Sequence, residues 1–171
     1  YLFDKDKGKT AFMEAARDCR EGGGKTGIAI SDPFCVERHR ADFLSLIENE
    51  LDFVIGNEAE IKSLYETDDF DTAKERVRGH CEIACLTRGE KGSVIVTADE
   101  EIEVAADIVA RVVDTTGAGD QYAAGFLYGY TQGYDLDTAG RIGSMMAAEI
   151  ISHYGARPEA DVKALLKAKL G

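Results

Sequence analysis

The stretch Asp114–Asp120, DTTGAGD in one-letter code, combines a glycine turn, a helix start and a carboxylate. The residues before it, 108–113, form an apolar run that predicts a strand, and residues 121–132 carry Ala, Tyr, Phe and Leu at helical spacing. We therefore expect the stretch to form a strand-to-helix turn. The alternative is an ordinary capped helix start, because Asp and Thr are good N-cap residues and glycine is common in turns.

A turn of this kind attracts an anion, because the first N–H groups of a helix have no partner within it and lie at the positive end of its dipole. Gly117 and Gly119 would let the backbone approach a phosphate with no Cβ in the way. A carboxylate beside an anion is unfavourable unless it has a chemical task, so we expect Asp120 to act as a general base on an attacking hydroxyl. Such a base contributes roughly 10²- to 10⁴-fold in rate, and N–H groups with a metal would stabilise the phosphoryl charge.

The composition describes a globular, acidic chain of the size of one domain. It has 171 residues, 44% of them hydrophobic, and only two prolines, which is enough to bury a core. The net charge of −12 argues against nucleic acid or an anionic membrane as partner. No apolar run reaches the roughly 18 residues of a transmembrane helix. Four cysteines without disulfide-type spacing indicate reduced thiols and a cytoplasmic location.

The periodicity of the sequence alternates between helix and strand. Helical spacing covers residues 10–20, 38–48, 58–65, 72–78, 119–131, 137–153 and 159–168. Apolar strands are predicted at residues 26–31, 52–55 and 83–87, and a hairpin at residues 94–96 and 102–104. We expect an α/β fold with three αβα layers, in which helices cover both faces of a mainly parallel sheet. No repeat or linker marks a domain boundary within the chain.

A second strand-end loop carries Asn57, which follows the strand at 52–55 and opens a helix. Glu60 comes three residues later, which is the spacing of a capping box, and helix stability alone would explain the pair. Alternatively, both side chains face phosphates and hold Mg²⁺ through water, because this ion prefers oxygen ligands and keeps much of its hydration. In a third loop, Thr87, Gly89 and Gly92 follow another strand, where α/β proteins bind ligands. A plain turn is an equally good interpretation of this third loop.

Taken in order, these three motifs, Asn57-x-x-Glu60, Thr87-x-Gly89-x-x-Gly92 and DTTGAGD, resemble those of the ribokinase-like (PfkB) carbohydrate kinases. The match spans most of the chain, and the last motif is highly specific. Residues 31–36, 57–65 and 152–158 look most like bacterial proteins of the adenosine kinase branch.

The resemblance implies ATP-dependent phosphotransfer to an alcohol group of a sugar or nucleoside, with the 5′-hydroxyl of adenosine favoured by the branch. Asp120 would be the general base, and Gly117, Ala118 and Gly119 would form the anion hole for the transferred phosphoryl group. The residues that would hold ATP and Mg²⁺ are Asn57, Glu60, Thr87, Gly89 and Gly92.

The resemblance also implies two accessory features. Asp114 and Thr116 match positions of a monovalent cation site, but Glu159 stands where a small polar residue is common, so dependence on K⁺ stays open. Residues 144–148, with Met145 and Met146, would lie near the adenine. Ordinary core packing is the favoured alternative for the two methionines.

The chain matches only the C-terminal, nucleotide-handling part of the family. The acceptor-binding N-terminal half, with its small β lid, has no counterpart, and the chain begins at Tyr1 rather than Met. We therefore expect residues 1–171 to be the nucleotide-binding and catalytic portion of a longer kinase, with weak ATP binding and little or no activity alone. A homodimer is left open.

Two other interpretations remain. One is a kinase of the same family that acts on ribose, fructose or another acceptor, and the other is a non-catalytic ATP-binding module. Retention of Asp120 argues against the module, because only chemistry requires a carboxylate there. A P-loop NTPase is excluded by the absence of Gly-x-x-x-x-Gly-Lys-Ser/Thr.

Overall fold

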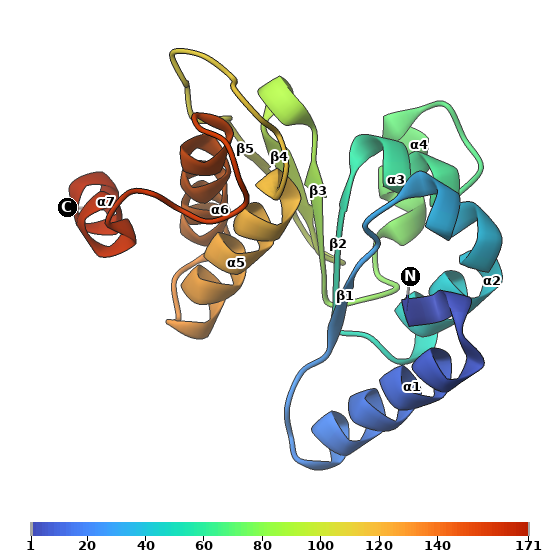
Figure 1. Cartoon of the computed structure of the whole chain (residues 1–171). Coiled ribbons are helices and arrows are strands. Elements are labelled where there is room, and N and C mark those ends of the chain that lie inside the picture. Colours follow the sequence, from blue (N-terminus) through green and yellow to red (C-terminus); the bar gives the residue numbers. More distant parts are fainter. Residues whose placement is uncertain (1, 171) are drawn as a thin grey trace. The chain divides into compact units, whose positions relative to one another are not determined.

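Helices and strands alternate through most of the computed structural model, which describes residues 2–170 (Figure 1). The strands are β1 (Gly27–Ala29), β2 (Phe53–Asn57), β3 (Ile83–Thr87), β4 (Ser93–Val96) and β5 (Glu101–Val104). They form one sheet in the order β1-β2-β3-β4-β5, with β1 parallel to β2 and β2 parallel to β3. The expected α/β fold with a mainly parallel sheet is confirmed, and so is the predicted hairpin of β4 and β5.

The helices fall close to the positions that periodicity predicts. They are α1 (Asp6–Glu21), α2 (Pro33–Asn49), α3 (Glu58–Leu64), α4 (Phe70–Val77), α5 (Ala118–Thr131), α6 (Leu136–Ile151) and α7 (Val162–Leu170). Short 3₁₀ segments lie at η1 (Leu2–Asp4) and η2 (Gly89–Lys91). Within residues 2–170, none of the helices is long and apolar enough to cross a membrane.

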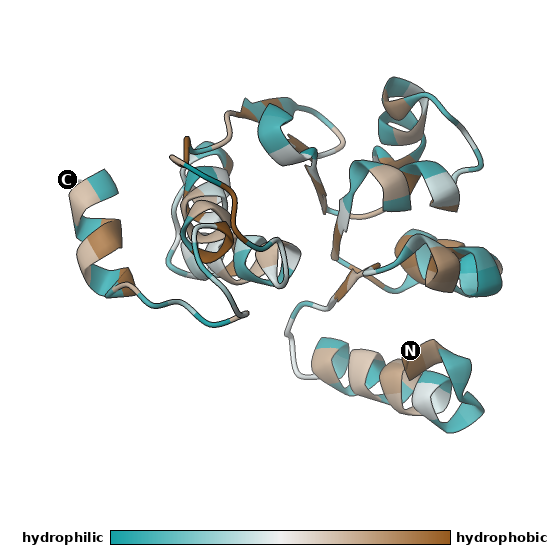
Figure 2. Ribbon diagram, turned by 45° about the horizontal axis from the view of Figure 1, so that its top comes forward, coloured by the Kyte–Doolittle hydropathy of each residue, from teal (hydrophilic) through white to brown (hydrophobic). Residues whose placement is uncertain are grey.

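The chain forms two compact units. Unit 1 contains the described residues up to Thr87 together with Val96–Glu101, and unit 2 contains Arg88–Ile95 and the described residues from Ile102 onward. Unit 1 has its core around β2 and β3, whose first four residues are all buried. Figure 2 shows these strands mainly in brown, whereas the helices of unit 1 carry both colours. This pattern fits parallel strands with two covered faces and helices with one.

The register of β2 and β3 sets the polar end of unit 1. Phe53 pairs with Ile83 at the start of the ladder, and Asn57 pairs with Thr87 at its end. Because the two strands are parallel, their carboxyl ends lie at the same edge of the sheet. Two of the residues expected to bind ligand are therefore neighbours.

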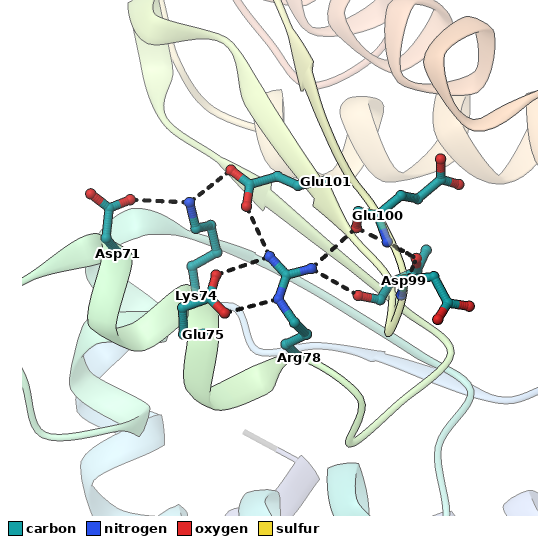
Figure 3. Close-up of polar contacts among 8 residues, drawn as sticks. Asp71, Lys74, Glu75, Arg78, Asp99, Glu100 and Glu101 are labelled. Atoms are coloured by element: carbon teal, nitrogen blue, oxygen red, sulfur yellow. Dashed lines mark hydrogen bonds and ion pairs between the residues drawn. The ribbon is translucent and has the colours of Figure 1, made fainter.

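Arg78 joins the end of α4 to the tip of the hairpin (Figure 3). Its guanidinium donates to the carbonyls of Thr97 (3.1 Å) and Glu100 (3.3 Å) and pairs with the carboxylates of Glu75 and Glu101, both at 2.9 Å. Lys74 Nζ also contacts Glu101, at 2.7 Å. The whole network lies within unit 1, which includes Val96–Glu101.

In unit 2, α5 packs against α6 (Figure 1). The two helices approach closely because small residues meet across the contact. A Cβ on Gly125 would lie 2.9 Å from Gly143 Cα, and a Cβ on Gly129 would lie 2.7 Å from Ala139 Cα. On α6, Ile142, Met145 and Met146 form a buried cluster against apolar side chains of α7. The interpretation of both methionines as core residues is confirmed.

The predicted strand at residues 108–113 is wrong. This segment has no regular structure, Ile108 is 98% exposed and Val112 is 53% exposed. Val113 N–H donates to Ile151 O at the end of α6 instead (2.8 Å). An apolar run becomes a strand only when another strand supplies hydrogen-bond partners, and none of the strands within residues 2–170 pairs with this run.

Candidate active site

The turn that precedes α5 is built around Gly117. This residue has φ 81°, in the left-handed region, and serves as the N-cap of the helix. A Cβ on Gly117 would also lie 2.9 Å from Ala156 Cβ. Backbone conformation and packing both require glycine here, since other residues rarely adopt a positive φ.

The first turn of α5 offers free donors. Among residues 2–170, the N–H groups of Gly119 and Asp120 have no acceptor, whereas Ala118 N–H donates to Thr115 O (3.1 Å). Gly119 is helical, and a Cβ there would meet nothing within 4 Å, so neither the fold nor the packing requires glycine. The arrangement fits an anion that approaches the backbone closely at Gly119, next to the exposed carboxylate of Asp120.

Asp114 organises the loop before this turn. Its Oδ1 accepts hydrogen bonds from Thr116 N (3.0 Å) and Thr116 Oγ1 (2.8 Å), and its Oδ2 accepts one from Gly155 N (3.3 Å). The backbone and hydroxyl of Thr116, followed by Gly155 N–H, hold the pKa of the Asp114 carboxyl below its ordinary value. These contacts account for both residues without an ion, and a monovalent cation at Asp114 and Thr116 stays a prediction.

Asn57 and Glu60 form the predicted capping box at the start of α3. Asn57 Oδ1 accepts from Glu60 N (2.9 Å), while Glu60 accepts from Asn57 N (2.8 Å) and Asn57 Nδ2 (2.7 Å). Glu60 is only 6% exposed. Burial raises the pKa of its carboxyl, the hydrogen bond from Asn57 N opposes the rise, and the carboxylate of Asp32 adds to it.

This pair fits a hydrated magnesium ion better than a directly coordinated one. Both carboxylate oxygens of Glu60 and the amide oxygen of Asn57 are already acceptors. Each of these oxygens has a further lone pair that can accept from water, and Mg²⁺ usually keeps several of its waters. Contact through water would leave the capping box intact.

The third predicted loop divides between the units. Thr87 belongs to unit 1, where its Oγ1 donates to Gly56 O at 3.5 Å. In unit 2, Gly89 and Gly92 have φ 58° and 85°. A Cβ on Gly92 would lie 2.0 Å from Val104 O, whereas one on Gly89 would meet nothing within 4 Å. Local packing thus explains Gly92, and Gly89 needs only its backbone conformation.

An open cavity of about 600 Å³ in unit 2 is lined in part by Met145 and Ala148 on α6 and by Ala106. Met145 and Ala148 belong to the stretch 144–148 expected near the adenine. Ser144 instead ties the preceding segment to α6, since its Oγ donates to Ala105 O (3.1 Å) and accepts from Asp107 N (2.9 Å).

Sequence reasoning missed Glu149, which also lines this cavity. Its side chain is 9% exposed and contacts His153 and the backbone of Glu159. The sequence did contain a signal for this residue, which is a carboxylate within the apolar helical run of residues 142–151. Such a charge becomes buried when the helix packs, and a buried charge requires partners.

Comparison with known proteins identifies the class of protein to which this chain belongs. The model of the pfkB family carbohydrate kinases matches residues 5–163, and the chain therefore belongs to this family of carbohydrate kinases.

Individual sugar and nucleoside kinases are similar to this chain over most of its length. A probable sugar kinase from Rhizobium etli CFN 42 matches with a TM-score of 0.96 and 42% identity, over 99% of this chain and 52% of that chain. Adenosine kinase from Sinorhizobium meliloti matches with a TM-score of 0.93 and 43% identity, over 99% of this chain and 51% of that chain. An uncharacterized sugar kinase of Archaeoglobus fulgidus is 41% identical over 122 residues, which are 71% of this chain and 48% of that protein. The chain spans about half the length of these relatives.

Proposed function

We propose that the whole protein containing this chain transfers the γ-phosphoryl group of ATP to the 5′-hydroxyl of adenosine. The observation that carries the proposal is the start of α5, where the Asp120 carboxylate adjoins two N–H groups that have no acceptor among the described residues. Family membership supports a kinase, and the 43% identity to the adenosine kinase of Sinorhizobium meliloti supports the acceptor.

In the proposed mechanism, Asp120 accepts the proton of the acceptor hydroxyl as the hydroxyl oxygen attacks the γ-phosphorus of ATP, and the bond from that phosphorus to ADP breaks as ADP leaves. The N–H groups of Gly119 and Asp120 stabilise the charge on the phosphoryl oxygens, and Gly117 and Ala118 shape the turn that presents them. Bound Mg²⁺ would supply positive charge on the phosphates.

Two further groups of residues have proposed roles in binding ATP. Asn57 and Glu60 would hold the hydrated metal through water, and Thr87, Gly89 and Gly92 would border the nucleotide. A monovalent cation near Asp114 and Thr116 would add to the positive charge there. We further propose that the enzyme is cytoplasmic and that its acceptor is a small molecule.

The test is ADP release by the whole protein with Mg-ATP, comparing adenosine, ribose and fructose with a control without acceptor. We expect adenosine-dependent release, abolished by Asp120→Asn. Turnover with ribose or fructose but not with adenosine would identify a kinase of the same family with a different acceptor. ATP binding without turnover would favour a non-catalytic module. Replacing K⁺ by a bulky organic cation in the same assay tests the cation role.

The 171-residue chain belongs in the same assay. The chain spans about half the length of its relatives, and we expect it to bind ATP weakly and to release little ADP with any acceptor. Normal adenosine-dependent turnover by this chain would show that it contains a working acceptor site.

A further inference from the structure

Glu149 clamps the loop of residues 152–160 to α6. Its Oε1 accepts hydrogen bonds from Glu159 N (2.8 Å) and Ala160 N (2.9 Å) and lies 3.2 Å from His153 Nε2. The other oxygen, Oε2, is buried and has no hydrogen-bond partner among the residues that the structure describes. One carboxylate oxygen therefore holds both the beginning and the end of this loop.

The loop that Glu149 holds forms a wall of the glycine turn. Gly155 N donates to Asp114 Oδ2 (3.3 Å). The neighbouring Ala156 lies so close to Gly117 that a Cβ on this glycine would be 2.9 Å from Ala156 Cβ. A shift of the loop would therefore move or release the turn.

Asp114 connects the loop of residues 152–160 to the start of α5, because its Oδ1 accepts hydrogen bonds from both Thr116 N and Thr116 Oγ1. Thr116 directly precedes Gly117, which caps the helix that carries Asp120. The same end of α6 also holds the segment before Asp114, through the bond from Val113 N to Ile151 O (2.8 Å).

We infer that Glu149 is a positioning residue, which fixes the glycine turn at residues 117–119 by clamping the loop that packs against it. The inference rests on the proposed function, since it assigns Glu149 a part in phosphoryl transfer. Without the carboxylate, the N–H groups of Glu159 and Ala160 lose their acceptor and the loop is released. A small displacement of the turn then lowers kcat, because catalysis depends on position more strongly than binding does.

The ionised form of Glu149 suits this role. Burial opposes its ionisation, but the hydrogen bonds from Ala160 N, Glu159 N and His153 outweigh burial, and the pKa of the carboxyl is lowered. Glutamine at this position keeps one oxygen that can accept the same N–H groups, whereas alanine keeps none. The two variants therefore separate the hydrogen-bonding role from side-chain volume.

The kinetic test compares Glu149→Ala and Glu149→Gln in the whole protein, with Glu103→Ala and Glu103→Gln as controls on the exposed face of β5. We expect Glu149→Ala to lower kcat by about 10- to 100-fold with little change in the KM for ATP. Glu149→Gln should keep kcat within about threefold, because its acceptor remains. Equal losses in both variants, or none in either, would overturn the inference.

Amide hydrogen exchange on the same variants tests the clamp independently of activity. We expect exchange at Gly155 and Thr116 to become about tenfold faster or more in Glu149→Ala and to stay near wild type in Glu149→Gln. If the unmodified protein shows no phosphotransfer, the proposed function fails, and exchange alone decides whether Glu149 positions the turn. Unchanged exchange at Gly155 in Glu149→Ala would overturn the clamp.

Discussion

Asn57 and Glu60 each accept a hydrogen bond from the backbone N–H of the other, at 2.9 Å and 2.8 Å, and a third bond joins their side chains at 2.7 Å. This reciprocal arrangement starts α3 directly after the buried strand β2. The carboxylate of Glu60 is thereby fixed at the carboxyl end of a parallel strand, although it is almost completely buried.

The buried carboxyl of Glu60 predicts a pH dependence of stability. Its pKa is raised above the ordinary value of 4.5, mainly by burial. A carboxyl with a higher pKa in the folded state contributes stability below the unfolded pKa, and this contribution is lost as pH rises through the folded pKa. We expect the free energy of unfolding, relative to that of Glu60→Gln, to fall as pH rises above 4.5. Urea unfolding of both proteins between about pH 4 and pH 8 measures the difference between their free energies of unfolding. A difference that stays constant over this range would contradict the prediction.

Gly119→Ala should separate stability from activity. A Cβ at this helical position meets nothing within 4 Å, so the variant should be more stable by about 0.4–1 kcal/mol. The same methyl group would block the close approach of a phosphoryl group, and we expect kcat to fall by about 10²-fold. Thermal unfolding and ADP release measure the two effects, and unchanged kcat would argue against the proposed anion hole at Gly119.

Gly117→Ala is the matched comparison for the same turn. Its φ of 81° is unfavourable for alanine, and the left-handed region costs about 1–2 kcal/mol for a residue with a Cβ. Contact with Ala156 adds to this cost. We expect lower thermal stability together with lost activity, and a variant as stable as wild type would show that the turn can rearrange.

Asp120→Asn should strongly lower turnover and leave ATP binding intact. The amide cannot accept the hydroxyl proton, so kcat should fall by about 10²- to 10⁴-fold. The affinity for ATP should stay similar or increase, because the substitution removes a negative charge from the proposed phosphate site. Calorimetry and ADP release by the whole protein measure both quantities. Asp137→Asn, at an exposed position in the first turn of α6, is the control, and equal effects of both variants would argue against a base at Asp120.

Arg78→Lys should destabilise the contact between α4 and the hairpin tip in Figure 3. Lysine cannot reach two carbonyls and two carboxylates at once, because it lacks the planar fork of the guanidinium. We expect a lower Tm and faster amide exchange at Glu100. Arg17→Lys on α1 is the control, because Arg17 is exposed and has no ion pair within the described chain. Equal Tm values for the two variants would mean that the network contributes nothing measurable.

The sequence by itself determined the local features of this protein. Helices over α1 to α7, the strands β2 and β3 and the Asn57–Glu60 capping box follow from patterns within a few residues, because helix hydrogen bonds and caps are made locally. The order of the three motifs likewise indicated the family, which the match over residues 5–163 confirms.

Only the tertiary structure decided the features that depend on distant partners. The apolar run at residues 108–113 predicted a strand, yet it is irregular, since a strand requires hydrogen-bond partners from another part of the chain. Glu149 and Arg78 gave no motif, because their partners in the loop 152–160 and at the hairpin tip are brought to them by folding. For Met145 and Met146 the sequence favoured core packing, and the structure confirmed it by placing α7 against them in unit 2, since burial depends on what each face of a helix meets in the folded chain.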